Sequence, residues 1–254
     1  MFKPVARKLL ASEVFDQIRQ RILSGEMEPG ASLPAERVLA SLLGVNRNAI
    51  REGLKRLQQA GLVAIQQGET TRVLDFKRTA GLEVLATMLV SEDGALNTKI
   101  VRSILELRSE LAPIVGRLAA ERGKRAHVVA LRAIIEKMQA AGDDTSVLVG
   151  LALDFWAQVV AATDNLALEL AFNSVAVSYG SVLAQTHHVM GDEVRAVEDY
   201  AALVEAIDGK KAEKAAALAK RIVARGEASI GRVTKVVDVF QRVTGMSTKK
   251  ERRP

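Results

Sequence analysis

The segment from Leu33 to Val73 limits the possible folds of this chain more than any other part of the sequence. Its first half predicts two short helices separated by a tight turn, because Gly44 can end a helix and Asn46 is a favourable N-cap for the next one. Apolar residues recur at helical spacing and give each helix one inner face: Val38, Leu39, Leu42 and Leu43 in the first, and Ile50, Leu54 and Leu57 in the second. This pattern predicts a helix-turn-helix motif.

The flanks of this segment complete a small domain. Residues 11–23 predict a preceding helix, which ends before Gly25, and Ser32 with Pro34 suits the start of the next helix. After Gly61 come two extended runs, LVAIQQ and TTRVLDF, which predict a hairpin because β-branched residues alternate on both sides of a glycine-containing break. Residues 1–76 therefore predict a winged helix-turn-helix DNA-binding domain.

The rest of the chain reads as almost entirely helical. We expect a linker and connecting helix at 77–96, an all-α helical bundle at 97–245 that binds a ligand and forms a dimer, and a basic disordered tail at 246–254. Amphipathic runs mark the helices of the bundle at about 97–122, 126–140, 147–163, 166–186, 191–208 and 211–240. The predicted fold is mainly α, and its alanine-rich helices are suited to close approach.

Composition narrows the partners and the location. The chain of 254 residues carries a net charge of +6, with 13 Lys and Arg against 8 Asp and Glu in residues 1–78 and 4 against 1 in the tail. Positive charge at both ends favours contact with a polyanion. The absence of cysteine excludes disulfides and thiolate metal sites. The N-terminus does not fit a signal peptide and no apolar run is long enough to span a membrane, so we expect a soluble, cytoplasmic protein.

The N-terminal residues of the second helix in a helix-turn-helix motif enter the major groove of DNA. In this chain they are Asn46, Arg47, Asn48 and Arg51. Arg47 and Asn48 are the candidates for reading bases, because Arg can bridge guanine and Asn can pair with adenine. Phosphate contacts are predicted for Arg37, Arg51, Lys55 and Arg56. Any one of these residues alone would more simply be a solvated surface residue, but together they favour a DNA-binding surface.

Residues 10–76 resemble the DNA-binding domain of GntR-family bacterial repressors, on the motifs LPAER, GVNRNAIREGL and IQQGETTRV. The continuation QQGETTRVLDFKRTAGLEVL is similar to the FadR branch of that family. The resemblance implies that Arg37, Arg47, Asn48 and Arg51 contact DNA and that Gln67 and Gly68, at the wing tip, lie in the minor groove. Asn46 and Asn48 replace hydroxyl residues of the branch, which leaves the operator sequence open.

The bundle resembles the effector domain of the same branch from about residue 104. Many relatives hold a divalent metal there with one Asp and three His, and the matching positions in this chain are Ala152, Trp156, Tyr200 and Ile222. None of these is suited to a divalent metal, so the resemblance implies an effector site without metal or other cofactor.

Trp156 is the main candidate for ligand contact. The resemblance implies an acyl-CoA ligand, since the acyl-CoA binders of the branch also have an aromatic residue at this position, and an apolar interior can hold a fatty chain. Trp156 can equally be an ordinary core residue. Asn173, Tyr179 and Tyr200 are candidate polar groups near such a cavity, with capping or rim positions as the simpler interpretation.

The leading interpretation is a homodimeric repressor of fatty-acid metabolism that binds double-stranded operator DNA and is released by long-chain acyl-CoA. The alternative within the same class is a metal-free regulator that responds to a small carboxylate metabolite. An enzyme is disfavoured because no nucleophile elbow, phosphate loop or His and carboxylate constellation is recognisable. An architectural DNA-binding protein remains a third possibility, and it would need no cavity in its bundle.

Overall fold

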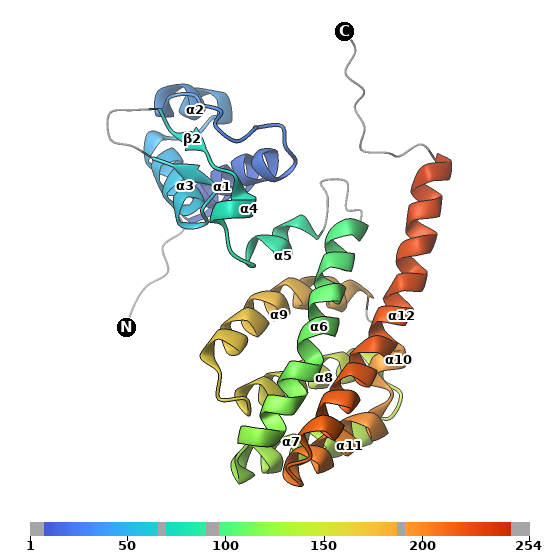
Figure 1. Cartoon of the computed structure of the whole chain (residues 1–254). Helices are drawn as coiled ribbons and strands as arrows, with labels where there is room; N and C mark the ends of the chain where they lie inside the picture. The colour runs from blue at the N-terminus through green and yellow to red at the C-terminus, as the bar shows by residue number, and fades with distance from the viewer. Residues whose placement is uncertain (1–7, 66–69, 90–96, 187–190, 245–254) are drawn as a thin grey trace. The chain divides into compact units, whose positions relative to one another are not determined.

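The computed structural model describes residues 8–65, 70–89, 97–186 and 191–244, and their side chains outside 8–9, 177–186 and 230–244. The chain divides into two compact units, Met1–Met88 and Leu89–Pro254 (Figure 1). Each unit has a hydrophobic core. Both units are predominantly helical, which confirms the predicted fold class.

The first unit is the predicted winged helix-turn-helix. Its helices are α1 (Lys8–Leu23), α2 (Glu36–Leu43) and α3 (Arg47–Gln59), followed by the antiparallel strands β1 (Val63–Ala64) and β2 (Arg72–Val73) and the short helices α4 (Phe76–Thr79) and α5 (Val84–Met88). Val63 pairs with Val73, and Ser32 forms an isolated bridge with Arg72 on the other side of β2. The wing is thus tied to the segment that leads into α2.

Helices α1 and α3 cross in close contact at Gly53. A Cβ atom on this glycine would lie 2.6 Å from Cγ1 of Val14, so a larger residue would push the two helices apart. The buried face of α3 is otherwise apolar and includes Ile50, Leu54 and Leu57, as the periodicity predicts. Burial of this face leaves the other side of α3 on the surface.

The structure corrects two details of this unit. Helix α2 begins at Glu36, and Ser32 lies in the bridge to β2 instead of capping the helix. Only Leu39 of the predicted apolar face is fully buried, Leu43 is partly buried, and Leu42 is 70% exposed. The reason is the helix's short length, because eight residues can present only one narrow face to the core.

Part of the predicted linker belongs to the first unit. Val84 of α5 is buried in the same core as α1 and α3, and the hydroxyl of Thr79 donates a hydrogen bond of 2.7 Å to the carbonyl oxygen of Gly61. Gly61 has a φ of +67°, and a Cβ there would collide with the backbone of Thr79. The segment after the wing therefore packs back against the end of α3.

The second unit is a helical bundle. It contains α6 (Thr98–Arg122), α7 (Arg125–Ala141), α8 (Thr145–Ala161), α9 (Leu166–Thr186), α10 (Gly191–Val194), α11 (Val197–Asp208) and α12 (Ala212–Thr244). The predicted helix at 191–208 is two helices, with a break at Arg195 and Ala196. No helix in the described part of the chain is long and apolar enough to cross a membrane.

Helices α6 and α12 run side by side through the bundle (Figure 1). A Cβ on Gly116 of α6 would lie 2.6 Å from the carbonyl oxygen of Ala215 and 2.8 Å from the Cβ of Ala219, both on α12. Small residues on both helices thus permit the close approach that the alanine-rich composition suggests. Ile114 of α6 is exposed because it lies away from this contact.

Candidate DNA-binding surface and apolar cavity

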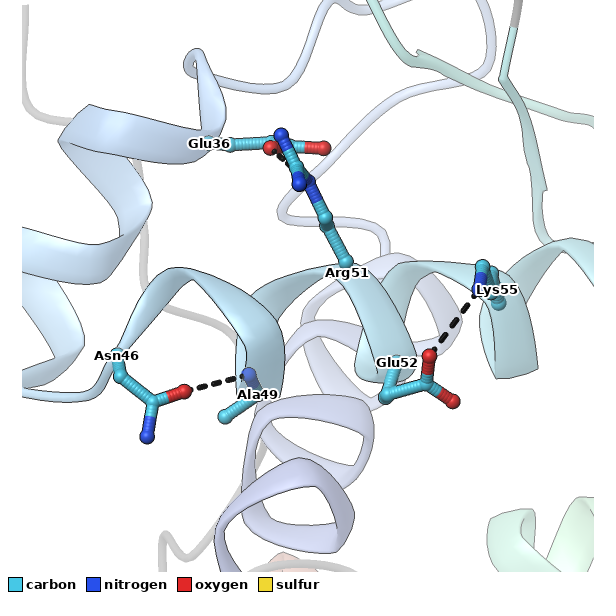
Figure 2. A network of polar contacts seen from close by, with 6 residues as sticks. All are labelled: Glu36, Asn46, Ala49, Arg51, Glu52 and Lys55. Carbon is cyan, nitrogen blue, oxygen red and sulfur yellow. Dashed lines mark hydrogen bonds and ion pairs between the residues drawn. The ribbon is translucent and has the colours of Figure 1, made fainter.

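The start of α3 is fixed by its N-cap. The side-chain oxygen of Asn46 accepts a hydrogen bond of 2.9 Å from the backbone N–H of Ala49 (Figure 2). This confirms the capping role predicted for Asn46 and commits one of its polar atoms to the helix. Arg47 and Asn48, the first two residues of α3, have exposed side chains. A cation in the first turn is disfavoured by the helix dipole, which makes Arg47 available to an acceptor outside the protein.

Three exposed cations lie along one side of α3 at four-residue spacing: Arg47, Arg51 and Lys55. Figure 2 shows that Arg51 reaches α2, where its Nε donates to Oε2 of Glu36 at 2.8 Å, and that Lys55 pairs with Glu52 at 3.1 Å. The described residues offer Arg47 no ion-pair partner. Within this row, Arg51 is therefore held in position while Arg47 is free to move.

The same surface includes Arg37 on α2, which is exposed and has no ion-pair partner among the described residues. Glu36, its neighbour, is the residue that sequence reasoning missed, although its place beside Arg37 in the LPAER motif could have indicated it. The remaining predicted contacts, Gln67 and Gly68, lie outside the described residues.

A cavity of about 110 Å³ lies within the bundle. Its wall is formed by side chains from α6, α8, α9, α10 and α12 and is almost entirely aliphatic, with Leu111, Val149, Leu153, Leu168, Val175 and Val223 among the contributors. Trp156 is the aromatic residue of α8 that lines it. A packed, dry interior would have favoured an architectural protein, and this cavity instead provides space for a small molecule.

Two charged residues also line the cavity. Arg108 of α6 donates from Nη2 to Oε1 of Glu193 of α10 at 2.7 Å, and the side chain of Glu193 is only 1% exposed. Burial raises the pKa of Glu193, and the neighbouring Arg108 opposes this effect only in part. The Arg108 and Glu193 pair thus compensates charge inside a nearly apolar space.

Three buried polar atoms lie here: Oε2 of Glu193, which has no hydrogen-bond partner among the described residues, and Nε1 of Trp156 and the hydroxyl oxygen of Tyr200, which interact with each other without forming a hydrogen bond of ordinary geometry. Burial raises the pKa of the Tyr200 phenol well above its ordinary value, and the Glu193 carboxylate raises it further. Buried polar atoms without partners are rare in native proteins, because the free-energy cost of removing such an atom from water is not offset by a hydrogen bond.

The structure brings together only part of the predicted ligand set. Trp156 lines the cavity, and Tyr200 is fully buried with its ring edge-on to Phe155 at 4.9 Å between centroids. Asn173 is exposed and does not line the cavity, whereas its neighbours Ala171 and Phe172 do. The side chain of Tyr179 lies outside those described.

Sequence reasoning missed Arg108 and Glu193. Arg108 could have been found, because it follows Ile104 by four residues and precedes Ala112 by four, and so lies within the apolar stripe of α6. Glu193 is in a four-residue helix with no comparable periodicity. Only the three-dimensional contact between α6 and α10 identifies it.

The four positions that the resemblance matched to metal ligands are all buried in the core of the bundle: Ala152, Trp156, Tyr200 and Ile222. Their side chains offer no carboxylate or imidazole to a metal ion. Within the described ranges no group of three His, Cys, Asp or Glu side chains is placed to hold a metal ion.

Comparison with known proteins matches both units to protein families. Residues 10–73 match the family described as bacterial regulatory proteins, gntR family, and residues 103–225 match the FCD domain. The chain is 41% identical over 217 residues to the HTH-type transcriptional regulator Mce2R of Mycobacterium tuberculosis, a match that covers 84% of this chain and 90% of that protein.

Two other similarities are more restricted. The fatty acid metabolism regulator protein of Vibrio parahaemolyticus is 38% identical over 124 residues, which is 48% of this chain and 44% of that protein. Among solved structures, Lar, described as controlling the expression of the Listeria monocytogenes agr system, has a TM-score of 0.52 at 17% identity and covers 91% of this chain and 99% of that one. At this identity the similarity to Lar shows the fold alone.

Proposed function

Since the chain belongs to the gntR family of bacterial regulatory proteins and is a transcriptional regulator with a DNA-binding domain and an FCD effector domain, we propose that it is a homodimeric repressor of fatty-acid metabolism. It binds double-stranded operator DNA through α3 and the wing, and long-chain acyl-CoA releases it. The observation that carries this proposal is the aliphatic cavity of the bundle, which is lined by Ala152 and Trp156. These two residues, with Tyr200 and Ile222 of the same core, stand at the positions where the resemblance places metal ligands.

On DNA, Arg47 and Asn48 read base edges in the major groove, and Arg37 and Arg51 contact phosphates. Their exposure and the free state of Arg47 support these roles. Glu36 holds Arg51 by its Nε, which leaves the two terminal nitrogens of the guanidinium for an acceptor on DNA. Gln67 and Gly68 contact the minor groove. The two DNA-binding domains of a homodimer contact two half-sites, which are related by the same two-fold axis as the two subunits.

The acyl chain occupies the cavity beside Trp156. The Vibrio relative is a fatty acid metabolism regulator protein, which supports a lipid ligand, and the aliphatic wall supports a hydrocarbon chain. A cavity of about 150 Å³ holds a molecule the size of benzene, so the space of about 110 Å³ takes only a few methylene groups. A long chain must therefore widen the cavity, and this displacement of packed helices is what shifts the population toward the state that does not bind DNA.

The second candidate is a regulator that answers to a small carboxylate metabolite. It is favoured by one observation, the cation Arg108 in the cavity wall. It is opposed by Glu193, which already occupies Arg108 at 2.7 Å.

The proposed function is tested by titrating the full chain, bound to a duplex selected from random DNA, with palmitoyl-CoA, palmitate, free CoA and succinate. We expect palmitoyl-CoA to release the DNA and free CoA and succinate to leave it bound. Release by succinate alone would refute the lipid proposal.

A variant pair checks that release depends on the cavity. Ala152→Phe places a ring in the space that Ala152 now borders, so DNA should remain bound at any concentration of palmitoyl-CoA. Gly150→Ala is the control on the same helix, because a Cβ there meets nothing within 4 Å, and it should respond like the wild type.

A further inference from the structure

The bond between Arg51 and Glu36 is the only side-chain hydrogen bond that joins α3 to α2 within the described residues. Nε of Arg51 donates to Oε2 of Glu36 at 2.8 Å, and Figure 2 shows the arginine side chain extending from α3 to the carboxylate on α2. The side chains are 58% and 39% exposed. An ion pair with this exposure adds little to stability, so stability does not by itself explain a carboxylate at this place.

The charge of Glu36 acts against the binding of DNA in general. Glu36 lies beside Arg37 and against Arg51, the two residues proposed to contact phosphates, which a carboxylate repels. The pair of Arg51 and Glu36 has no net charge, so it attracts a phosphate less than a free arginine would. The carboxylate thus lowers the part of the affinity that every DNA sequence shares.

The pair also determines which atoms of Arg51 are left for DNA. A guanidinium carries five N–H groups in a rigid plane, and Glu36 takes the one on Nε. The two terminal nitrogens remain for an acceptor on DNA. An arginine that is already held in one conformation loses less conformational freedom on binding than a free one. Arg51 therefore contacts a phosphate at one place relative to α3, instead of any phosphate that a freely moving side chain would reach.

We propose that Glu36 is a specificity-determining residue, and that it acts by positioning Arg51. On the operator, the phosphate contact of Arg51 and the base contacts of Arg47 and Asn48 form in the same register and reinforce each other. On other sequences the held arginine does not move to a nearer phosphate, and the charge of Glu36 opposes loose binding. This inference rests on the proposed function, because it takes α3 as the helix that reads DNA, and it assigns part of the discrimination to a residue that contacts no base.

The test compares the affinity of the full chain for a duplex selected from random DNA with its affinity for a duplex of random sequence. The ratio of these affinities, the specificity ratio, is measured by fluorescence anisotropy at KCl concentrations from about 50 to about 200 mM. In Glu36→Ala we expect the specificity ratio to fall at least about tenfold. Binding to the random duplex should strengthen, and its logarithmic salt dependence should steepen by about 0.9, because Arg51 is free to neutralise a phosphate. A specificity ratio equal to that of the wild type would overturn the inference.

Glu52→Gln is the matched control for the loss of charge. Glu52 pairs with Lys55 at 3.1 Å within α3, and both side chains are exposed. This variant removes the same charge from the same surface without breaking a bond to α2, so both duplexes should bind more tightly and the specificity ratio should not change. A fall in the ratio as large as that in Glu36→Ala would reduce the effect of Glu36 to its charge and refute the positioning of Arg51.

Two further variants show whether Glu36 acts through Arg51. In an Arg51→Ala background, Glu36→Ala should leave the specificity ratio unchanged, because no guanidinium remains to be positioned; a persistent fall would refute the proposed role. Glu36→Asp keeps a negative charge in the first turn of α2, where the helix dipole favours it, but shortens the side chain by one methylene group. Its specificity ratio should also fall, whereas a role in the stability of α2 alone predicts the wild-type ratio. Glu36→Asp decides the question if Glu36→Ala does not fold.

These measurements separate the inference from the proposed function. If the wild type selects no sequence from random DNA, the proposed function fails. If it selects one and the Glu36 variants keep the wild-type specificity ratio, the inference alone fails. The ratio is measured without an effector, so it does not depend on whether palmitoyl-CoA releases the DNA.

Discussion

Replacing Arg47 with alanine should change stability and DNA binding in opposite directions. Arg47 is the first residue of α3 and is exposed, and the described residues provide no ion-pair partner. A cation at a helix N-terminus opposes the dipole by about 0.3–1 kcal/mol, so Arg47→Ala should stabilise the free protein by up to about 1 kcal/mol. If the side chain bridges a guanine, its loss costs about 1–3 kcal/mol of specific binding, which is about a 5- to 150-fold weaker complex.

The measurement combines thermal unfolding with binding to a selected duplex and to a duplex of random sequence at one salt concentration. We expect a melting temperature equal to or above that of the wild type, a loss of affinity for the selected duplex, and a smaller loss for the random one. Lys55→Ala, two turns further along α3, provides the contrast, because removal of a phosphate contact weakens both duplexes equally. Equal losses for Arg47→Ala on both duplexes would refute base reading, and a lower melting temperature would refute the electrostatic argument.

Three further results are expected in the second unit, all measured by thermal unfolding of the full chain. Gly116→Val should destabilise the second unit by about 1–3 kcal/mol, because the new Cβ would lie 2.6 Å from the carbonyl oxygen of Ala215. Gly150→Ala, where the new Cβ meets nothing within 4 Å, should stabilise this unit by about 0.5–1 kcal/mol. Equal shifts in melting temperature for the two variants would contradict this account. Tyr200→Phe should change the free energy of unfolding by less than about 1 kcal/mol, because the buried hydroxyl makes no hydrogen bond of ordinary geometry to the described residues, and a larger loss would mean that its interaction with Trp156 is a full hydrogen bond. Burial raises the pKa of Glu193, so the folded chain retains a proton that the unfolded chain loses, and stability falls as the pH rises above the ordinary value of 4.5. The side chain of Glu193→Gln does not titrate, so the melting temperature of this variant should rise relative to that of the wild type as the pH increases above 4.5; a difference that stays constant would contradict the raised pKa.

The helix-turn-helix was predictable because its determinants are local. Gly44 adopts the left-handed conformation with φ of +64° and ends α2, and Asn46 caps α3 three residues before the N–H that it accepts from. Each of these helix ends is determined by residues within one helical turn of each other, so the sequence alone is enough to predict it. The position of Leu42 was not predictable in the same way, because its exposure depends on which side of α2 the remainder of the unit covers.

The cavity was only half predictable. Helical periodicity and the resemblance pointed to Trp156 and Tyr200, since both lie on the inner faces of their helices. Periodicity cannot show that Arg108 of α6 meets Glu193 of α10, because that contact depends on how the helices pack and not on the spacing within either one. Asn173 illustrates the same limit, since one position along α9 separates an exposed side chain from the inward-facing Phe172.

Helix α10 connects the cavity to the rest of the bundle. Besides the bond from Glu193 to α6, Asp192 accepts a hydrogen bond of 2.8 Å from Ser229 of α12, and Arg195, just past the helix, donates one of 2.8 Å to Thr145 of α8. A helix of four residues cannot hold its own conformation, so its position depends on contacts with neighbouring helices, among them these three bonds and the burial of Val194 in the core. A ligand in the cavity that displaces α10 therefore acts on an element that is bonded to α6, α8 and α12. The binding energy of the ligand is coupled to the packing of all three helices if the ligand favours one arrangement of α10 over another.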